Sequence, residues 1–372
     1  MDTAAVTGAA GTSGSLLSEG LGTRVFITEH ATRDVSVPIA IRDVTADYQS
    51  LMERRQSVTA ALLSELGRLA KEQPSLIAAV VRLLNTDGSV HSPFRLLPFP
   101  LLGALTSQQD QALFVVMCSR LWWTGAEVFD DLTDGEFDTP EVGLSAAQAA
   151  VASTACLGPL PQILIEHSCF PEDVRTAWAR EFAVGSLNAA EGQLKDLTDG
   201  LHDAAWANTM RIYASKSGAP YGRDAAMTAV LAGAETDAVS GWRIFGRLFG
   251  VLRQMVNDRA AASAEENKDL ANGTMTLLVA LASDTAQGAE AQFLKELRVR
   301  ALEDVRGRNE LWRFLTRPNL TIAYDQRVRL IHRKLSELLH TLTDASGNRD
   351  LIQWMVNISA QNALIAGEAG VA

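Results

Sequence analysis

Three carboxylates close a long apolar segment of the sequence. The run "LFVVMCSRLWWTGAEVF" is followed by "DDLTDG", which holds Asp130, Asp131 and Asp134 and stops at Gly135. Residues four apart share a helical face, so Asp130 and Asp134 are expected side by side, with Asp131 adjacent. Such carboxylates repel one another and, at a helix C-terminus, also oppose the helix dipole. The pattern predicts a bound cation, and oxygen ligands that leave room for water and phosphate favour Mg²⁺.

The acidic pentapeptide "DLTDG" returns at 196–200. In "EGQLKDLTDG", Gln193 and Asp196 are three residues apart and are expected on one helical face. We assign this amide and this carboxylate to the neighbourhood of a metal ion or a diphosphate. For either acidic segment taken alone, a solvated helix end is the alternative.

A third acidic stretch lies in "VLRQMVNDRAAASAEENKD". Asn257, Ala261 and Glu265 follow one another at intervals of four residues, so they stack on one helical face, and Asp258 is adjacent to Asn257. The stretch therefore forms a third acidic site, after those at Asp130 and Asp196.

Two basic residues stand between the second and third acidic stretches. The segment "MRIYASKSGAPYG" contains Arg211 and Lys216 just before a Gly-Ala-Pro helix break. Both cations are predicted to bind phosphate oxygens. The alternative, surface basic residues before a turn, applies more readily to Lys216 than to Arg211, whose neighbours are apolar.

The elements that carry these residues are predicted to be helices. From about Val44 onward, apolar residues recur every three or four positions, and prolines separate the runs. The only strand-like region is "RVFITEHATRDVSVPIAI", which suggests a short hairpin. We expect a disordered tail over 1–22, an extension with the hairpin over 23–44, and a single all-α domain, a large helical bundle, over 45–366.

Composition excludes several classes of protein. A net charge of −11 disfavours a nucleic-acid surface, and three cysteines are too few for a disulfide framework. The N-terminus lacks the basic and apolar regions of a secretory signal, and no 18 consecutive residues are all apolar, so no membrane span is expected. The sequence predicts a cytoplasmic protein.

The order of the segments carries a resemblance to a known family. "DDLTD", "GQLKD", "KSGA", "GRLFGVLRQMVND" and "KDLANGTMTLLVALA" follow one another as in a degenerate trans-polyprenyl diphosphate synthase, over roughly residues 90 to 340. The resemblance implies the all-α isoprenoid synthase fold, a central apolar cavity and a homodimer. It also implies a cluster of three Mg²⁺ ions that binds a prenyl diphosphate between two acidic helices.

Departures from the family pattern bear on its second substrate, isopentenyl diphosphate. No Arg follows the first acidic motif in "GEFDTPEVG", and "SPFRLLP" keeps only Arg95 of an upstream basic motif. Trp123 stands where the family has a His, and Thr274 where it has a Lys. Because the missing groups bind the diphosphate of isopentenyl diphosphate in the family, ordinary chain elongation is not expected.

The second acidic motif resembles a different branch of the fold. Asn257, Asp258 and Glu265 match the metal triad of class I terpene cyclases, except that Ala261 replaces its hydroxyl residue. Arg211 resembles the Arg that senses the diphosphate in these cyclases. Gly125 and Ala126 are small at positions that limit the depth of the prenyl cavity in the synthases.

The resemblance and its departures together predict a Mg²⁺-dependent class I terpene synthase that ionises farnesyl or geranylgeranyl diphosphate. The catalytic residues expected from this prediction are Asp130, Asp131, Asp134, Arg211, Lys216 and Asn257. Two alternatives remain open: a prenyltransferase whose acceptor is not isopentenyl diphosphate, and a non-catalytic partner subunit.

Overall fold

The computed structural model describes residues 15–17, 25–27, 44–86, 92–199, 205–259 and 268–365 of the 372-residue chain. Within these ranges the protein is helical apart from two three-residue strands. The predicted all-α class is therefore confirmed. Glu265 and Ala261 lie outside the described residues, as do most of the predicted tail and extension.

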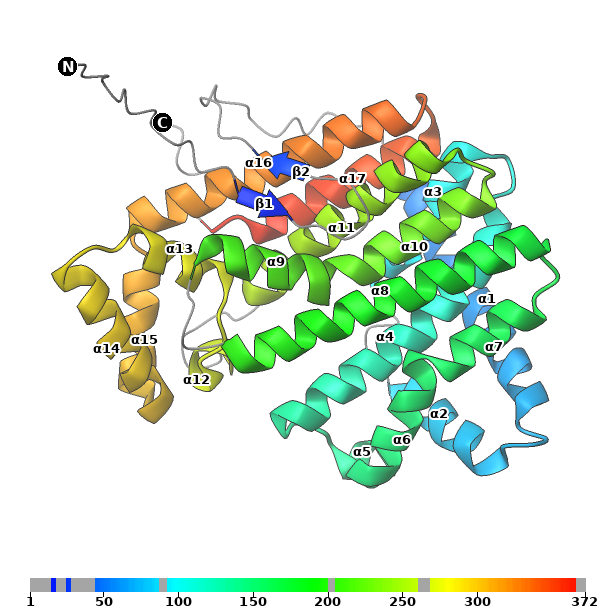
Figure 1. The fold of residues 1–372 in the computed structure, drawn as a ribbon, viewed down its shortest axis with the longest axis horizontal. Helices are drawn as coiled ribbons and strands as arrows, with labels where there is room; N and C mark the ends of the chain where they lie inside the picture. The colour runs from blue at the N-terminus through cyan, green and yellow to red at the C-terminus, as the bar shows by residue number, and fades with distance from the viewer. Residues whose placement is uncertain are drawn as a thin grey trace, which may run out of the picture.

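Helices of eight or more residues follow one another from residue 45 to residue 363, joined by shorter helical turns (Figure 1). The bounds are α1 Thr45–Leu69, α2 Pro74–Thr86, η2 Pro93–Leu96, α3 Pro98–Leu105, η3 Gln109–Ala112, α4 Leu113–Asp134, α5 Thr139–Val142, α6 Ala146–Leu157, α7 Pro159–His167, α8 Glu172–Asp199, α9 Trp206–Lys216, α10 Gly218–Leu231, α11 Thr236–Arg259, α12 Lys268–Asn272, α13 Leu277–Thr285, α14 Ala289–Glu303, α15 Val305–Leu315, α16 Pro318–Leu342 and α17 Gly347–Ala363.

Glycines bring α10 and α11 into direct backbone contact. A Cβ atom at Gly246 would lie 2.3 Å from the carbonyl oxygen of Tyr221, and one at Gly250 would lie 2.4 Å from that of Ser217. Any larger residue would push the helices apart. This close packing places the start of α10 against the C-terminal half of α11, where the third acidic stretch begins. Figure 1 shows α8, α10 and α11 side by side across the middle of the molecule.

Helix α4, which carries the first acidic motif, packs against α6 and α10. It ends as predicted at Gly135, whose φ of 71° is a left-handed C-cap that glycine adopts without strain. Gly125 serves the α4–α6 contact, because a Cβ there would lie 2.9 Å from the Cβ of Cys156 and from the carbonyl oxygen of Ser153. Gly125 therefore serves helix packing, while Ala126, the other small residue singled out in the sequence, lines the cavity described below.

The predicted hairpin forms with a different partner strand. β2 (Val25–Ile27) lies in the strand-like region, but it pairs antiparallel with β1 (Ser15–Leu17), upstream in the segment expected to be a disordered tail. Leu16 pairs with Phe26.

Two of the described helical stretches, Gln109–Asp134 and Ala146–His167, are long and apolar enough to cross a membrane by length and composition alone. About half of each apolar window, 56% and 50%, is buried inside the protein. The core helices of a large helical bundle have the same properties. These two stretches therefore give no clear membrane span.

Candidate functional site

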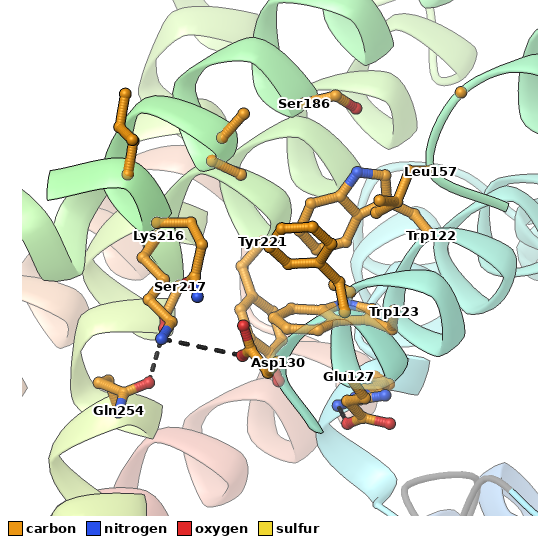
Figure 2. A pocket seen from close by; sticks show the side chains of 18 of the residues that line it. Trp122, Trp123, Glu127, Asp130, Leu157, Ser186, Lys216, Ser217, Tyr221 and Gln254 are labelled. Atoms are coloured by element: carbon orange, nitrogen blue, oxygen red, sulfur yellow. Dashed lines mark hydrogen bonds and ion pairs between the residues drawn. The ribbon is translucent and has the colours of Figure 1, made fainter. Parts of the chain in front are cut away.

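A cavity of about 840 Å³ lies between α4, α6, α8, α11 and the start of α10 (Figure 2). Its size falls within the range of small-molecule pockets. Aromatic rings of Trp122, Trp123 and Tyr221 form one end, and Asp130 with Lys216 forms the other. The predicted apolar cavity is therefore present, with one strongly polar end.

Close contact between α8 and α9 builds the polar end. A Cβ atom at Gly192 would lie 2.3 Å from the backbone nitrogen of Lys216, so only glycine lets the two helices approach this far. The ammonium group of Lys216 then lies 2.7 Å from Oδ2 of Asp196 and 3.8 Å from Oδ2 of Asp130. Gln193 lines the cavity beside them. Residues from three predicted segments thus meet at one point.

Charges at this end perturb one another. Burial, opposed by Lys216 and reinforced by Asp134, Asp196 and Asp131, raises the pKa of Asp130 to about 6. Burial lowers the pKa of Lys216, but Asp130 and Asp196 outweigh it, so the net pKa is raised and the ammonium stays charged. Several carboxylates therefore share one lysine, which leaves an excess of negative charge.

The other first-motif carboxylates and one residue that the sequence reasoning missed complete this cluster. Asp131 and Asp134 are exposed at the end of α4. Asp269 on α12 has its pKa raised by burial and by Asp196, opposed by Lys216. Its position at the end of "AEENKD", the last residue of the third acidic stretch, was the sequence signal that could have indicated it.

The third acidic stretch is divided between two environments. Asn257 is exposed and lines the cavity. Asp258 is partly buried, and both its oxygens accept hydrogen bonds: Oδ2 from the Tyr213 hydroxyl at 2.5 Å and Oδ1 from Nε2 of Gln254 at 3.1 Å. Burial, opposed by the Tyr213 hydrogen bond, raises the pKa of Asp258 to about 7. Asp258 therefore does not line the cavity with Asn257, contrary to the predicted pair of ligands.

Arg211 is not brought to the cavity. Its side chain is exposed on α9 and donates to Oδ1 of Asn208 at 3.2 Å, one turn earlier. Lys216 lies five residues along the same helix and faces the opposite way, into the site. The structure thus places Lys216 at the cavity and Arg211 away from it. Their spacing along α9 puts the two side chains on different helical faces.

A second polar group lies on the cavity wall, away from Lys216. Arg95 forms an ion pair with Glu127, and its guanidinium lies 4.4 Å from the ring centre of Trp123. Figure 2 shows Glu127 below Trp123, with Asp130 toward Lys216. Sequence reasoning singled out Arg95 and Trp123 as departures from a pattern but missed Glu127. The signal was its place one helical turn before Asp130 in "GAEVFDD".

The donor set around Asp130 suits Mg²⁺ better than the set around Asp258. Among the described residues, no three His, Cys, Asp or Glu side chains form a metal-binding group by themselves. Magnesium, however, commonly binds one or two carboxylates together with substrate phosphates. Asp130 and Asp134 fit that arrangement, because the excess negative charge around Asp130 favours a cation. Asp258 fits less well, because it does not line the cavity and its carboxylate is held by Tyr213 and Gln254.

No protein-family model matches the chain, and no curated protein matches it either. Solved structures do. Geranylgeranyl pyrophosphate synthetase from Pyrococcus horikoshii aligns with a TM-score of 0.70 and 16% identity, over 85% of this chain and 99% of its own. Decaprenyl diphosphate synthase from Rhodobacter capsulatus aligns with a TM-score of 0.71 and 14% identity, over 84% and 98%.

A further similar structure is geranylgeranyl pyrophosphate synthase from Corynebacterium glutamicum, complexed with calcium and isoprenyl diphosphate. It aligns with a TM-score of 0.69 and 16% identity, over 89% of this chain and all of its own. These identities are low, so the likeness concerns the fold. The chain has the all-α isoprenoid synthase fold of the polyprenyl diphosphate synthases.

Proposed function

We propose that the protein is a prenyltransferase that ionises an allylic prenyl diphosphate at Asp130 and Lys216 and transfers the prenyl group to an acceptor other than isopentenyl diphosphate. The observation that carries the proposal is the position of Lys216. It stands between Asp130 and Asp196 at the polar end of an apolar, aromatic cavity. Farnesyl and geranylgeranyl diphosphate each consist of an apolar chain and a polyanionic head. They therefore match a cavity with an apolar end and a polar end.

The leaving group is stabilised at the polar end. Lys216 donates hydrogen bonds to diphosphate oxygens and offsets the charge that grows there as the carbon–oxygen bond breaks. Asp130 and Asp134 would hold Mg²⁺, which when bound neutralises diphosphate charge. Asp196 orients Lys216 through the 2.7 Å contact, and Gln193 can donate its amide to the diphosphate.

The prenyl cation is stabilised at the aromatic end. The faces of Trp122, Trp123 and Tyr221 attract positive charge through their ring quadrupoles, and the apolar walls exclude water that would otherwise capture the cation. Leu194 and Leu197, 58% and 52% exposed, line the cavity from α8. Their exposure places an apolar opening beside α8 through which a prenyl chain can enter.

The ion pair of Arg95 favours transfer to a different acceptor over chain elongation. This Arg is retained from the upstream basic motif, but Glu127 neutralises it. A second diphosphate would have to compete with that carboxylate for the guanidinium. The similar structures named above include synthases of prenyl diphosphates, which supports prenyl transfer as the reaction class.

A terpene cyclase is the second candidate, and the aromatic lining of the cavity favours it. Rings of Trp122, Trp123, Phe129 and Tyr221 could stabilise successive carbocations of one cyclising chain. The hydrogen bonds on Asp258 count against it, because they engage a ligand of the predicted cyclase triad.

The test is diphosphate release by purified protein with Mg²⁺ and farnesyl or geranylgeranyl diphosphate, each with and without isopentenyl diphosphate. We expect Mg²⁺-dependent release and no elongated product. Release with a cyclic hydrocarbon or alcohol as the main product would favour the cyclase. Absence of release, or efficient elongation, would contradict the proposal.

A further inference from the structure

One face of α4 presents an aromatic ring and two carboxylates to the cavity in succession. Trp123, Glu127 and Asp130 are spaced by four and three residues, and all three line the cavity. Asp130 is within 3.8 Å of Lys216, whereas Glu127 pairs with Arg95, whose guanidinium lies over the Trp123 ring. The two carboxylates therefore lie one helical turn apart, at different positions along the same cavity.

Two cations line the cavity wall near Glu127, and the protein engages them to different extents. Arg95 is held by Glu127 and the Trp123 ring. Arg253 lies 3.9 Å from the ring centre of Phe94, and its buried Nη1 has no hydrogen-bond partner among the described residues. A diphosphate acceptor would compete with Glu127 for Arg95, whereas a neutral acceptor would leave that ion pair intact and could accept a hydrogen bond from Nη1 of Arg253.

A neutral O–H or N–H acceptor has a proton to lose, and Glu127 is placed to take it. Its side chain is 36% exposed, and it lies on the same helical face as Asp130. Asp130 itself is engaged with Lys216 at the leaving-group end. The ion pair with Arg95 fixes the orientation of the Glu127 carboxylate.

Resting on the proposed function, we propose that Glu127 is the general base for a neutral acceptor that carries a hydroxyl or amine group, and that Arg95 positions it. The carbon–oxygen bond of the prenyl diphosphate breaks, and its electron pair leaves with the diphosphate. A lone pair of the acceptor oxygen or nitrogen forms the bond to the prenyl carbon. The proton of that oxygen or nitrogen passes to the Glu127 carboxylate, while the electrons of the broken bond remain on the acceptor atom.

The test compares nucleophiles that lose a proton with one that does not. Wild-type protein, Glu127→Gln and the control Glu191→Gln, an exposed residue of α8, are given geranylgeranyl diphosphate, Mg²⁺ and either phenol, aniline or azide. Azide attacks as an anion and needs no base. We expect Glu127→Gln to lower prenyl phenol and prenyl aniline formation by about 10²- to 10⁴-fold. Prenyl azide formation should be unchanged or increased, because Arg95 is released.

The azide reaction also reports whether the variant is folded and can ionise the substrate. Glu191→Gln should match wild type with all three nucleophiles, and acetate should partly restore phenol transfer in Glu127→Ala. The proposal is overturned if wild type releases diphosphate yet prenylates neither phenol nor aniline, or if Glu127→Gln lowers all three products equally. If wild type releases no diphosphate under any condition, the proposed function itself fails, and the two failures are thereby distinguished.

Discussion

The C-terminal ends of α4 and α11 carry similar acidic residues in different surroundings. On α4, one oxygen of Asp130 lies 3.8 Å from the ammonium group of Lys216 and faces the cavity. On α11, both oxygens of Asp258 accept hydrogen bonds, one from Tyr213 and one from Gln254. The two motifs look alike in sequence, but only the first leaves its carboxylate open to a ligand.

Neighbouring donors decide this difference. Ser217 donates to Oε1 of Gln254 at 2.6 Å, which fixes the amide so that its nitrogen reaches Asp258. Tyr213 approaches Asp258 from α9, one turn before Lys216. The same helix thus supplies a cation to the first acidic site and a neutral donor to the second. An acidic motif indicates a ligand site only when the opposing helix leaves its oxygens available.

Loss of Asp130 should have the largest effect on activity. Asp130→Asn removes a carboxylate ligand from the leaving-group end, and we expect diphosphate release to fall by about 10³-fold. Asp344→Asn, at an exposed position between α16 and α17, is the matched control and should be unaffected. Steady-state release of diphosphate measures both. Normal turnover by a folded Asp130→Asn protein would refute the role of α4.

Removal of the shared cation should have the next largest effect. Lys216→Met takes away the ammonium group that lies against both Asp130 and Asp196, and we expect a loss of about 10²-fold in diphosphate release. Arg211→Met on the exposed face of α9 is the control, and should retain activity. If Arg211→Met proves as damaging as Lys216→Met, the assignment of the phosphate-binding cation is wrong.

Acid should inactivate the first site before it unfolds the protein. The pKa of Asp130 is about 6, so below that pH the carboxylate takes up a proton and no longer attracts a cation. We expect diphosphate release to fall about tenfold per pH unit below about 6. The measurement is a pH profile at Mg²⁺ concentrations below saturation, because bound Mg²⁺ would itself lower the pKa of Asp130, and a flat profile down to pH 5 would show that Asp130 need not be ionised.

The smallest effect on activity is expected at Asp258. Asp258→Asn should keep diphosphate release within about threefold of wild type, because this side chain contacts Tyr213 and Gln254 and not the cavity. Asp258→Asn should instead change the free energy of unfolding. Because the folded-state pKa of about 7 exceeds the unfolded value of 3.8, the native protein holds this proton more tightly than the unfolded chain.

The corresponding stabilisation is complete below pH 3.8 and is lost as pH rises to about 7. The asparagine variant should therefore lose less stability than wild type between pH 5 and pH 8, as measured by urea unfolding at both values. An identical pH dependence in the two proteins would mean that burial does not raise the pKa of Asp258 in the folded protein.

Periodicity and motif order were enough to predict the helical class, the end of α4 at Gly135 and the meeting of Asp130, Gln193, Lys216 and Asn257 at one cavity. The helical class and the end of α4 follow from local spacing and capping, whereas the meeting of the four segments was predicted from the resemblance to a known family. The orientation of Arg211, the engagement of Asp258 and the role of Gly125 depend on which helix packs against each face. Packing between segments distant in sequence cannot be read from spacing within one segment.

The most direct test of the account is a single-turnover assay of diphosphate release from geranylgeranyl diphosphate, run in parallel on wild type, Asp130→Asn and Asp258→Asn. The account predicts that Asp130→Asn loses release while Asp258→Asn retains it. Retained release in Asp130→Asn, or equal loss in both variants, would contradict the claim that the end of α4, and not that of α11, activates the prenyl diphosphate.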